Sequence, residues 1–206
     1  MTSQGAPSRL HGEGQMGNSA RQEIAGVIIA IAMILSAPAS SRAEVAELLQ
    51  KLNLTAYSRG TTPPEFNGRM ADGRKVSLAS LQGKVVVLNF WATWCQECRS
   101  EMPAFQQLHR EFSGQGLAVI GINAREETTT IRDYAKELGL TFPVIVDPKG
   151  TINAAYGVIG LPTTFLIGRN GRPVALAVGP REWASTPARA IIQALLAEPA
   201  SLKGAR

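Results

Sequence analysis

The feature that most constrains this chain is a strand-like apolar run that leads directly into a cysteine pair. Residues 85–91 read Val-Val-Val-Leu-Asn-Phe-Trp, and Cys95 follows after three more residues. A continuous, largely β-branched run is typical of a strand that is covered on both faces. From Cys95 to Gly114, apolar residues recur at helical spacing, which predicts a helix of about five turns. A buried strand that passes directly into a helix indicates an α/β fold.

The segments around this unit continue the alternation of strands and helices. After residue 114 the pattern predicts strands over 117–123, 142–146, 163–167 and 174–178, and helices over 129–138 and 187–197. Before the run, residues 71–74 read Ala-Asp-Gly-Arg, a hairpin-turn signature within residues 67–78. We therefore predict a mixed central sheet flanked by helices, with an N-terminal β-hairpin extension.

The first 43 residues differ from the rest in composition. Residues 24–35 are uniformly apolar, Arg21 precedes them and small residues follow, as in a secretory signal with cleavage before Ser40 or Glu44. The run is short for a membrane span, yet an uncleaved anchor remains an alternative. We expect a disordered N-terminal extension over 1–20, a signal peptide or membrane anchor over 21–43, a short helix and linker over 44–62, and the folded domain over 63–200.

Cysteine and histidine usage points to redox chemistry and away from a structural metal. Cys95 and Cys98 are the only cysteines, and a crosslink over so short a loop stabilises a fold very little. A structural zinc site needs four ligands, and His109 is the only histidine beyond the leader, so one chain cannot assemble such a site. The sequence predicts a redox pair, no metal site and no cofactor.

The charge distribution argues against a nucleic-acid partner. The net charge is +5, but the 21 basic residues are scattered and form no run or stripe. We interpret the charge as a contribution to solubility.

The position of the cysteines predicts different tasks for them. Cys95 stands at the start of the expected helix, where free backbone N–H groups and the helix dipole favour a thiolate and make it the better nucleophile. Cys98 lies one turn further in, more covered, and is placed to resolve a mixed disulfide by attacking the sulfur of Cys95.

Two motifs carry a resemblance to a known family. Residues 87–103 read Val-Leu-Asn-Phe-Trp-Ala-Thr-Trp-Cys-Gln-Glu-Cys-Arg-Ser-Glu-Met-Pro, and residues 160–167 read Gly-Leu-Pro-Thr-Thr-Phe-Leu-Ile. Both resemble the thioredoxin-like proteins of the TlpA and ResA group, and the resemblance covers about 63–197. Residues 179–185 resemble the TlpA side of that group. The resemblance implies a thioredoxin fold for the domain over 63–200.

The resemblance also implies roles for residues around the cysteines. Pro162 is expected to be cis and to face the cysteines, which leaves the backbone of Leu161 for pairing with an extended substrate peptide. Asn89 stands where thioredoxin itself carries a buried aspartate, so that proton acceptor is absent. The implied catalytic residues are Cys95, Cys98, Glu101 and Pro162, and the expected substrate-contacting residues are Trp94, Gln96, Glu97, Leu161 and Pro162.

Two glutamates and two ring residues leave alternatives open. Glu101 is the candidate general base for Cys98, since both share one side of the helix; the alternative is a solvated glutamate favoured only by the helix dipole. Glu97 replaces the proline that usually precedes the second cysteine and puts the redox potential in doubt. For Trp91 we favour a core role, and for His109 packing rather than catalysis.

Together these features predict a periplasmic thiol-disulfide oxidoreductase, soluble after signal cleavage or tethered to the inner membrane. We expect it to reduce disulfides in exported client proteins with cysteine pairs that await haem or copper, as in cytochrome or copper-site maturation. The resemblance implies a membrane thiol-disulfide electron donor. The alternatives are a redox-linked thiol chaperone without turnover and a thiol peroxidase, although no Pro-x-x-x-Thr-x-x-Cys loop is present.

Overall fold

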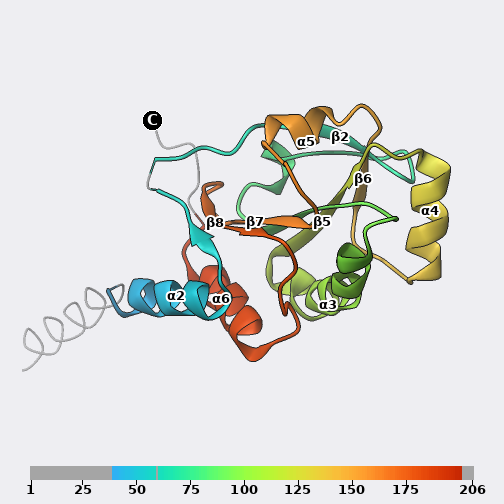
Figure 1. Ribbon diagram of the computed structural model, residues 1–206. Coiled ribbons are helices and arrows are strands. Elements are labelled where there is room, and N and C mark those ends of the chain that lie inside the picture. Colours follow the sequence, from blue (N-terminus) through green and yellow to red (C-terminus); the bar gives the residue numbers. More distant parts are fainter. Residues whose placement is uncertain (1–38, 59, 201–206) are drawn as a thin grey trace, which may run out of the picture. The chain divides into compact units, whose positions relative to one another are not determined.

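The computed structural model describes residues 39–58 and 60–200 (Figure 1). The disordered extension expected over 1–20 lies outside the described residues. So does the signal peptide or anchor expected over 21–43, except for its last five residues. The compact unit that carries the cysteines begins at Arg42. None of the helices in the described part of the chain is both long and apolar enough to cross a membrane.

The centre of this unit is an eight-stranded mixed sheet in the order β1-β8-β7-β4-β5-β6-β2-β3. Strands β4, β5 and β6 run parallel, and every other pairing is antiparallel. The strands are β1 (Thr55–Ala56), β2 (Asn67–Met70), β3 (Lys75–Ser77), β4 (Val85–Trp91), β5 (Leu117–Ala124), β6 (Val144–Asp147), β7 (Thr163–Ile167) and β8 (Pro173–Val178). The predicted mixed sheet is confirmed, with β4 at its predicted bounds.

Helices cover both faces of this sheet, as Figure 1 shows. They are α2 (Ala39–Lys51), α3 (Gln96–Phe112), α4 (Thr128–Glu137), α5 (Thr151–Ala155) and α6 (Thr186–Ala197), with 3-10 turns at Ala79–Leu81 and Ser113–Gln115. Alternate residues of β4 enter two separate cores. Val85 and Val87 pack in one core with apolar residues of α2, α3, α4 and α6, and Val86 and Leu88 pack in the other, beside Tyr156 at the end of α5. The continuous apolar run of β4 follows from this double coverage.

Three local features differ from the sequence prediction. The N-terminal hairpin is built into the sheet edge, because β2 pairs with β6. The strand predicted over 142–146 is β6, which begins two residues later than predicted, at Val144. Pro143 has no N–H for a ladder hydrogen bond. Helix α5 was not predicted; its first turn depends on Asp147, whose carboxylate accepts hydrogen bonds from three consecutive backbone N–H groups of residues 151–153.

The segment before residue 63 belongs to the same packing unit as the domain. Leu48, Leu49, Leu52 and Leu54 are buried in the core that also contains α3 and α6. Strand β1 pairs with β8 and so forms the far edge of the sheet. Helix α2 overlaps the segment 44–62, for which a short helix and a linker were expected. The division of the chain at residue 63 stays a prediction.

Candidate active site

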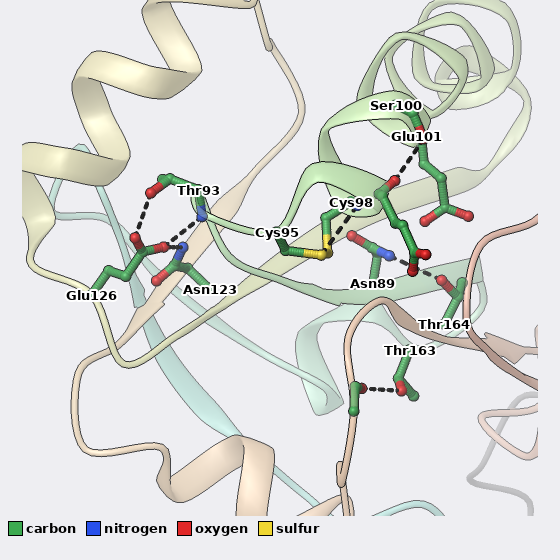
Figure 2. Close-up of a disulfide and its surroundings, with 12 residues drawn as sticks. Asn89, Thr93, Cys95, Cys98, Ser100, Glu101, Asn123, Glu126, Thr163 and Thr164 are labelled. Atoms are coloured by element: carbon green, nitrogen blue, oxygen red, sulfur yellow. Dashed lines mark hydrogen bonds between the residues drawn. A yellow bond between two sulfur atoms is a disulfide. The ribbon is translucent and has the colours of Figure 1, made fainter.

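Cys95 and Cys98 form a disulfide at the N-terminus of α3 (Figure 2), with their sulfurs 2.07 Å apart. Cys95 is the N-cap residue of the helix, and its sulfur accepts a hydrogen bond from the backbone N–H of Cys98 at 3.2 Å. Cys95 is 8% exposed, whereas Cys98 is fully buried. Cys95 is thus the more accessible of the two cysteines, while their separate roles in exchange stay a prediction.

Pro162 lies at the start of the strand that runs beside β4. The Leu161–Pro162 peptide bond is cis, as the resemblance implied. The carbonyl of Pro162 accepts a hydrogen bond from the N–H of Gly179 at 2.8 Å, and the hydroxyl of Thr163 donates to the carbonyl of Gly160 at 2.7 Å. These bonds hold the loop before β7 in place. Within the described residues, Leu161 makes no backbone hydrogen bond, which leaves its N–H and C=O for an incoming segment.

Asn89 is buried beneath the cysteines on the α3 side of the sheet. It is 1% exposed and lies opposite Thr164 in the β4–β7 register. Its Nδ2 donates to the Thr164 hydroxyl at 2.9 Å, and its Oδ1 has no hydrogen-bond partner in the described structure. A neutral amide cannot take a proton, so this position supplies no base.

Glu101 is buried one turn beyond Cys98 on the same helix and is only 3% exposed. Its Oε1 accepts two hydrogen bonds of 2.7 Å, one from the backbone N–H of Arg181 and one from the indole Nε1 of Trp183. Its Oε2 is also buried but has no hydrogen-bond partner among the described residues. The alternative of a solvated glutamate is wrong, because the loop after β8 covers this carboxylate.

The surroundings of Glu101 change its acidity. Burial raises the pKa of Glu101 from 4.5 to about 7, against the opposing effect of the two hydrogen bonds and the Arg181 charge. The charge on Glu97 raises this pKa further. A carboxyl that titrates near neutrality is able both to take up and to release a proton at physiological pH.

A second carboxylate, Glu126, holds the other side of the cysteine turn (Figure 2). It accepts hydrogen bonds from the backbone N–H of Thr93 at 2.7 Å, from the Thr93 hydroxyl, and from Nδ2 of Asn123 at 2.6 Å. Arg125, just before it, adopts a left-handed φ of 63°, uncommon for a residue with a side chain. Glu126 was not predicted from the sequence, since no motif connects it to Thr93, 33 positions earlier.

Most side chains expected to contact substrate lie on the surface near the disulfide. Trp94 is 72% exposed, and Gln96 and Glu97 are also exposed, whereas Pro162 is buried and Leu161 half-buried. Two further apolar side chains are exposed: Ile159, three residues before Pro162, at 96%, and Val178, at the end of β8, at 53%. Neither belongs to a motif, so sequence reasoning did not identify them.

Trp91 and His109 occupy packing positions, as predicted. Trp91 is fully buried and its ring centroid lies 5.2 Å from that of Tyr134. His109 packs edge-on against Phe142, and burial lowers its pKa. No group of three or more His, Cys, Asp or Glu side chains in the described residues is arranged to hold a metal ion.

Comparisons with known proteins agree with this geometry. The sequence profile of the AhpC/TSA family matches residues 60–174. The chain belongs to the AhpC/TSA family. It is 39% identical over 125 residues to the thiol-disulfide oxidoreductase ResA of Geobacillus thermodenitrificans, a match that spans 61% of this chain and 72% of that protein. The AhpC/TSA chain is thus a thiol-disulfide oxidoreductase of the thioredoxin fold.

Solved structures support the same assignment. The crystal structure of a putative thiol:disulfide interchange protein DsbE from Chlorobium tepidum is similar with a TM-score of 0.63 and 33% identity, over 68% of this chain and 99% of that chain. A secreted thiol-disulfide isomerase from Corynebacterium glutamicum has a TM-score of 0.58 and 28% identity, over 69% of this chain and 89% of that chain. The closer similarity to TlpA that residues 179–185 indicated stays a prediction.

Proposed function

We propose that this protein reduces disulfides in other exported proteins, with Cys95 as the attacking thiol and Cys98 as the resolving thiol. The observation that carries the proposal is the asymmetry of the pair: Cys95 caps α3 and is 8% exposed, whereas Cys98 is fully buried. The helix N-terminus favours the thiolate of Cys95, and an incoming disulfide reaches only that sulfur.

The proposed reaction has two exchange steps. The Cys95 thiolate attacks one sulfur of the client disulfide, forms a mixed disulfide and releases the other client sulfur as a thiolate, which takes up a proton. Cys98 then loses its proton to Glu101 and attacks the sulfur of Cys95. This step forms the Cys95–Cys98 disulfide, releases the second client thiol and transfers two electrons to the client in total. A thiol-disulfide electron donor at the membrane returns the pair to the reduced state.

The proposed client surface surrounds the outer cysteine. Exposed Trp94, Ile159 and Val178 offer apolar contacts, and Gln96 and Glu97 border them. The free backbone groups of Leu161, held by the Pro162 turn, would pair with an extended client segment. This surface fits an extended, apolar segment around a cysteine. We expect the clients, exported proteins whose cysteine pairs await haem or copper, to present such a segment.

We propose a location outside the cytoplasm, in the periplasm. The apolar run over 24–35 supports export, and the similar Corynebacterium glutamicum isomerase is described as secreted. Both a cleaved, soluble form and a form tethered to the inner membrane are compatible with the proposal. Detection of the protein in separated periplasmic and membrane fractions, together with the mass of the mature protein, would distinguish the two forms.

Trapping tests the roles of the two cysteines. Cys98→Ser should accumulate a mixed disulfide with a cysteine-pair peptide, because the resolving thiol is gone, whereas Cys95→Ser should not. The reverse result would exchange the two roles.

Turnover tests the class of protein. Reduction of insulin disulfides with a suitable reductant should be catalytic, whereas a thiol chaperone would bind reduced clients without turnover. Peroxide consumption at a comparable rate would instead favour the thiol peroxidase alternative.

A further inference from the structure

The loop after β8 contacts Glu101 twice but takes no part in the two proposed exchange steps. Residues 179–185 connect β8 to α6, and residues 181 and 183 donate both hydrogen bonds to the Glu101 carboxylate. Trp183 is 1% exposed, and its ring lies 5.4 Å from that of Phe105, one turn beyond Glu101 on α3. The indole is therefore held by packing as well as by its hydrogen bond.

The two carboxylate oxygens of Glu101 differ in a way that suits a proton acceptor. Both donors go to Oε1, and Oε2, which is buried, has none among the described residues. A buried polar atom without a partner costs free energy, so this arrangement needs an explanation other than stability. Because Glu101 and Cys98 are three residues apart on one helix, their side chains share one side of it, as expected for proton exchange between them.

We propose that Trp183 is a positioning residue for thiol-disulfide exchange: its indole N–H holds Oε1 of Glu101, so that Oε2 is left to take the proton of Cys98. This rests on the role proposed above for Glu101. In the resolving step the S–H bond of Cys98 breaks and an O–H bond forms at Oε2. The Cys98 thiolate then attacks the sulfur of Cys95, the Cys95–client disulfide bond breaks, and the client sulfur leaves as a thiolate that takes up a proton from water.

The loop that carries Trp183 is itself anchored to the N-terminal part of the unit. The guanidinium of Arg181 donates to the backbone carbonyl of Asn53 at 2.9 and 3.2 Å. Asn53 lies in the turn after α2 and has a left-handed φ of 50°. The position of Trp183 therefore depends on the turn after α2, through Arg181 and Asn53, as well as on its own contacts with α3.

The charged and titratable groups around Glu101 come from three elements. Glu97 and the reduced Cys98 lie on α3, Arg181 and Glu182 on the loop after β8, and Lys51 at the end of α2. Lys51, Arg181 and Glu182 line the same hollow of about 690 Å³ as Glu101. Of these groups, Arg181 lowers the pKa of Glu101 and Glu97 raises it. Trp183 is uncharged, so its substitution leaves the charges around Glu101 unchanged.

The reaction with 5,5′-dithiobis(2-nitrobenzoate) tests the proposal, because it separates the two thiols. Cys95 releases one coloured thiolate when it attacks the reagent, and Cys98 releases a second when it resolves the mixed disulfide. The second release is followed against pH in wild type, Trp183→Phe, Glu101→Gln and the double variant. Phenylalanine keeps an aromatic ring against Phe105 and removes the donor. Trp91→Phe is the matched control, since it removes a buried indole N–H that has no partner in the described structure.

Loss of the indole donor should raise the pH midpoint of the second release by about one unit, because the hydrogen bond favours the carboxylate. At pH 7 this corresponds to a rate roughly fivefold lower, with recovery towards the wild-type rate by about pH 9. The first release and the Trp91→Phe midpoint should not change. Trp183→Phe should have no further effect in the Glu101→Gln background.

Two results would overturn the proposal. One is an unchanged pH midpoint of the second release in Trp183→Phe. The other is that Trp183→Phe slows the second release equally in the wild-type and Glu101→Gln backgrounds, as a purely structural role requires. If Glu101→Gln itself resolves like wild type, the base role of Glu101 fails instead. If Trp183→Phe does not fold, site-specific incorporation of benzothienylalanine removes the donor and keeps the ring shape. The same midpoint shift is then expected, and its absence counts against Trp183.

Discussion

Glu101 and Glu126 stand on opposite sides of the same disulfide turn, and their environments make them different chemical groups. Glu126 accepts three hydrogen bonds, shared between its two oxygens, and so ties residue 93 to the loop after β5. Glu101 is more deeply buried, accepts hydrogen bonds at one oxygen only, and has a pKa raised to about 7. The comparison teaches that burial and donor count decide whether a carboxylate clamps a loop or exchanges a proton.

The largest effect expected from this difference is on the pH dependence of stability. The folded chain retains the proton of Glu101 between pH 4.5 and about 7, where the unfolded chain has lost it. Stability due to the protonated group is therefore fully present below pH 4.5 and is lost as the pH rises through about 7. The total change is roughly 3 kcal/mol.

Denaturant unfolding of the oxidised protein against pH measures this change. The difference between wild type and Glu101→Gln isolates it, because the other titrating groups are common to both. A difference that does not vary between pH 4 and 8 would mean that Glu101 ionises as an ordinary surface carboxyl.

Removal of the clamp should have the next largest effect. Glu126→Ala leaves the backbone N–H of Thr93 and the amide of Asn123 without their acceptor, and we expect a loss of about 2 kcal/mol in unfolding free energy at pH 7. The neighbouring Glu127→Ala is the control, since its side chain is exposed and makes no capping hydrogen bond to α4; its effect should stay within about 0.5 kcal/mol.

The two variants should also separate in kinetics. Glu126→Ala disturbs the turn that presents Cys95 and should slow attack by Cys95, whereas Glu101→Gln should slow resolution by Cys98. Equal slowing of both steps in both variants would erase the proposed distinction between clamp and base.

The smallest effect concerns Glu97, a third carboxylate that is exposed and acts only by its charge. At about 7 Å and an effective dielectric of about 40 to 80, it should oppose a Cys95 thiolate by roughly 0.6 to 1.2 kcal/mol. This destabilises the reduced form, so Glu97→Gln should raise the reduction potential by roughly 10 to 25 mV, as measured against glutathione.

Salt provides the control for this prediction. Near 1 M salt the shift should largely vanish, since exposed charges are screened within a few ångströms. A potential that is unchanged or lower in Glu97→Gln at low salt would show that this carboxylate does not affect the thiolate.

Most of the fold was predictable because its signals are local. The β4 run, the Asp-Gly turn at 71–74 and the helical pattern over 187–197 each determine a structure from neighbouring residues. The errors arose where a distant contact decides. Strand β1 is only two residues long and exists because β8 offers an edge, and α5 forms around the carboxylate of Asp147.

The candidate site divides in the same way. Cys95, Cys98 and Pro162 belong to motifs; the two cysteines form a disulfide and the peptide bond before Pro162 is cis. Glu101 was identified by its spacing from Cys98, but spacing left its environment open. Glu126 carried no signal at all, because its partners are one hydroxyl and one backbone group 33 residues away and an amide in the adjacent strand.

The sequence by itself determined the α/β fold and the redox pair at a helix N-terminus, because periodicity and short-range spacing encode both. Only the tertiary structure decided which glutamate is buried, which oxygen is left unpaired and which loop covers it. A segment 80 residues further along the chain supplies the donors to Glu101. The pKa of a carboxyl depends on every group within a few ångströms, and those groups are brought together only by folding.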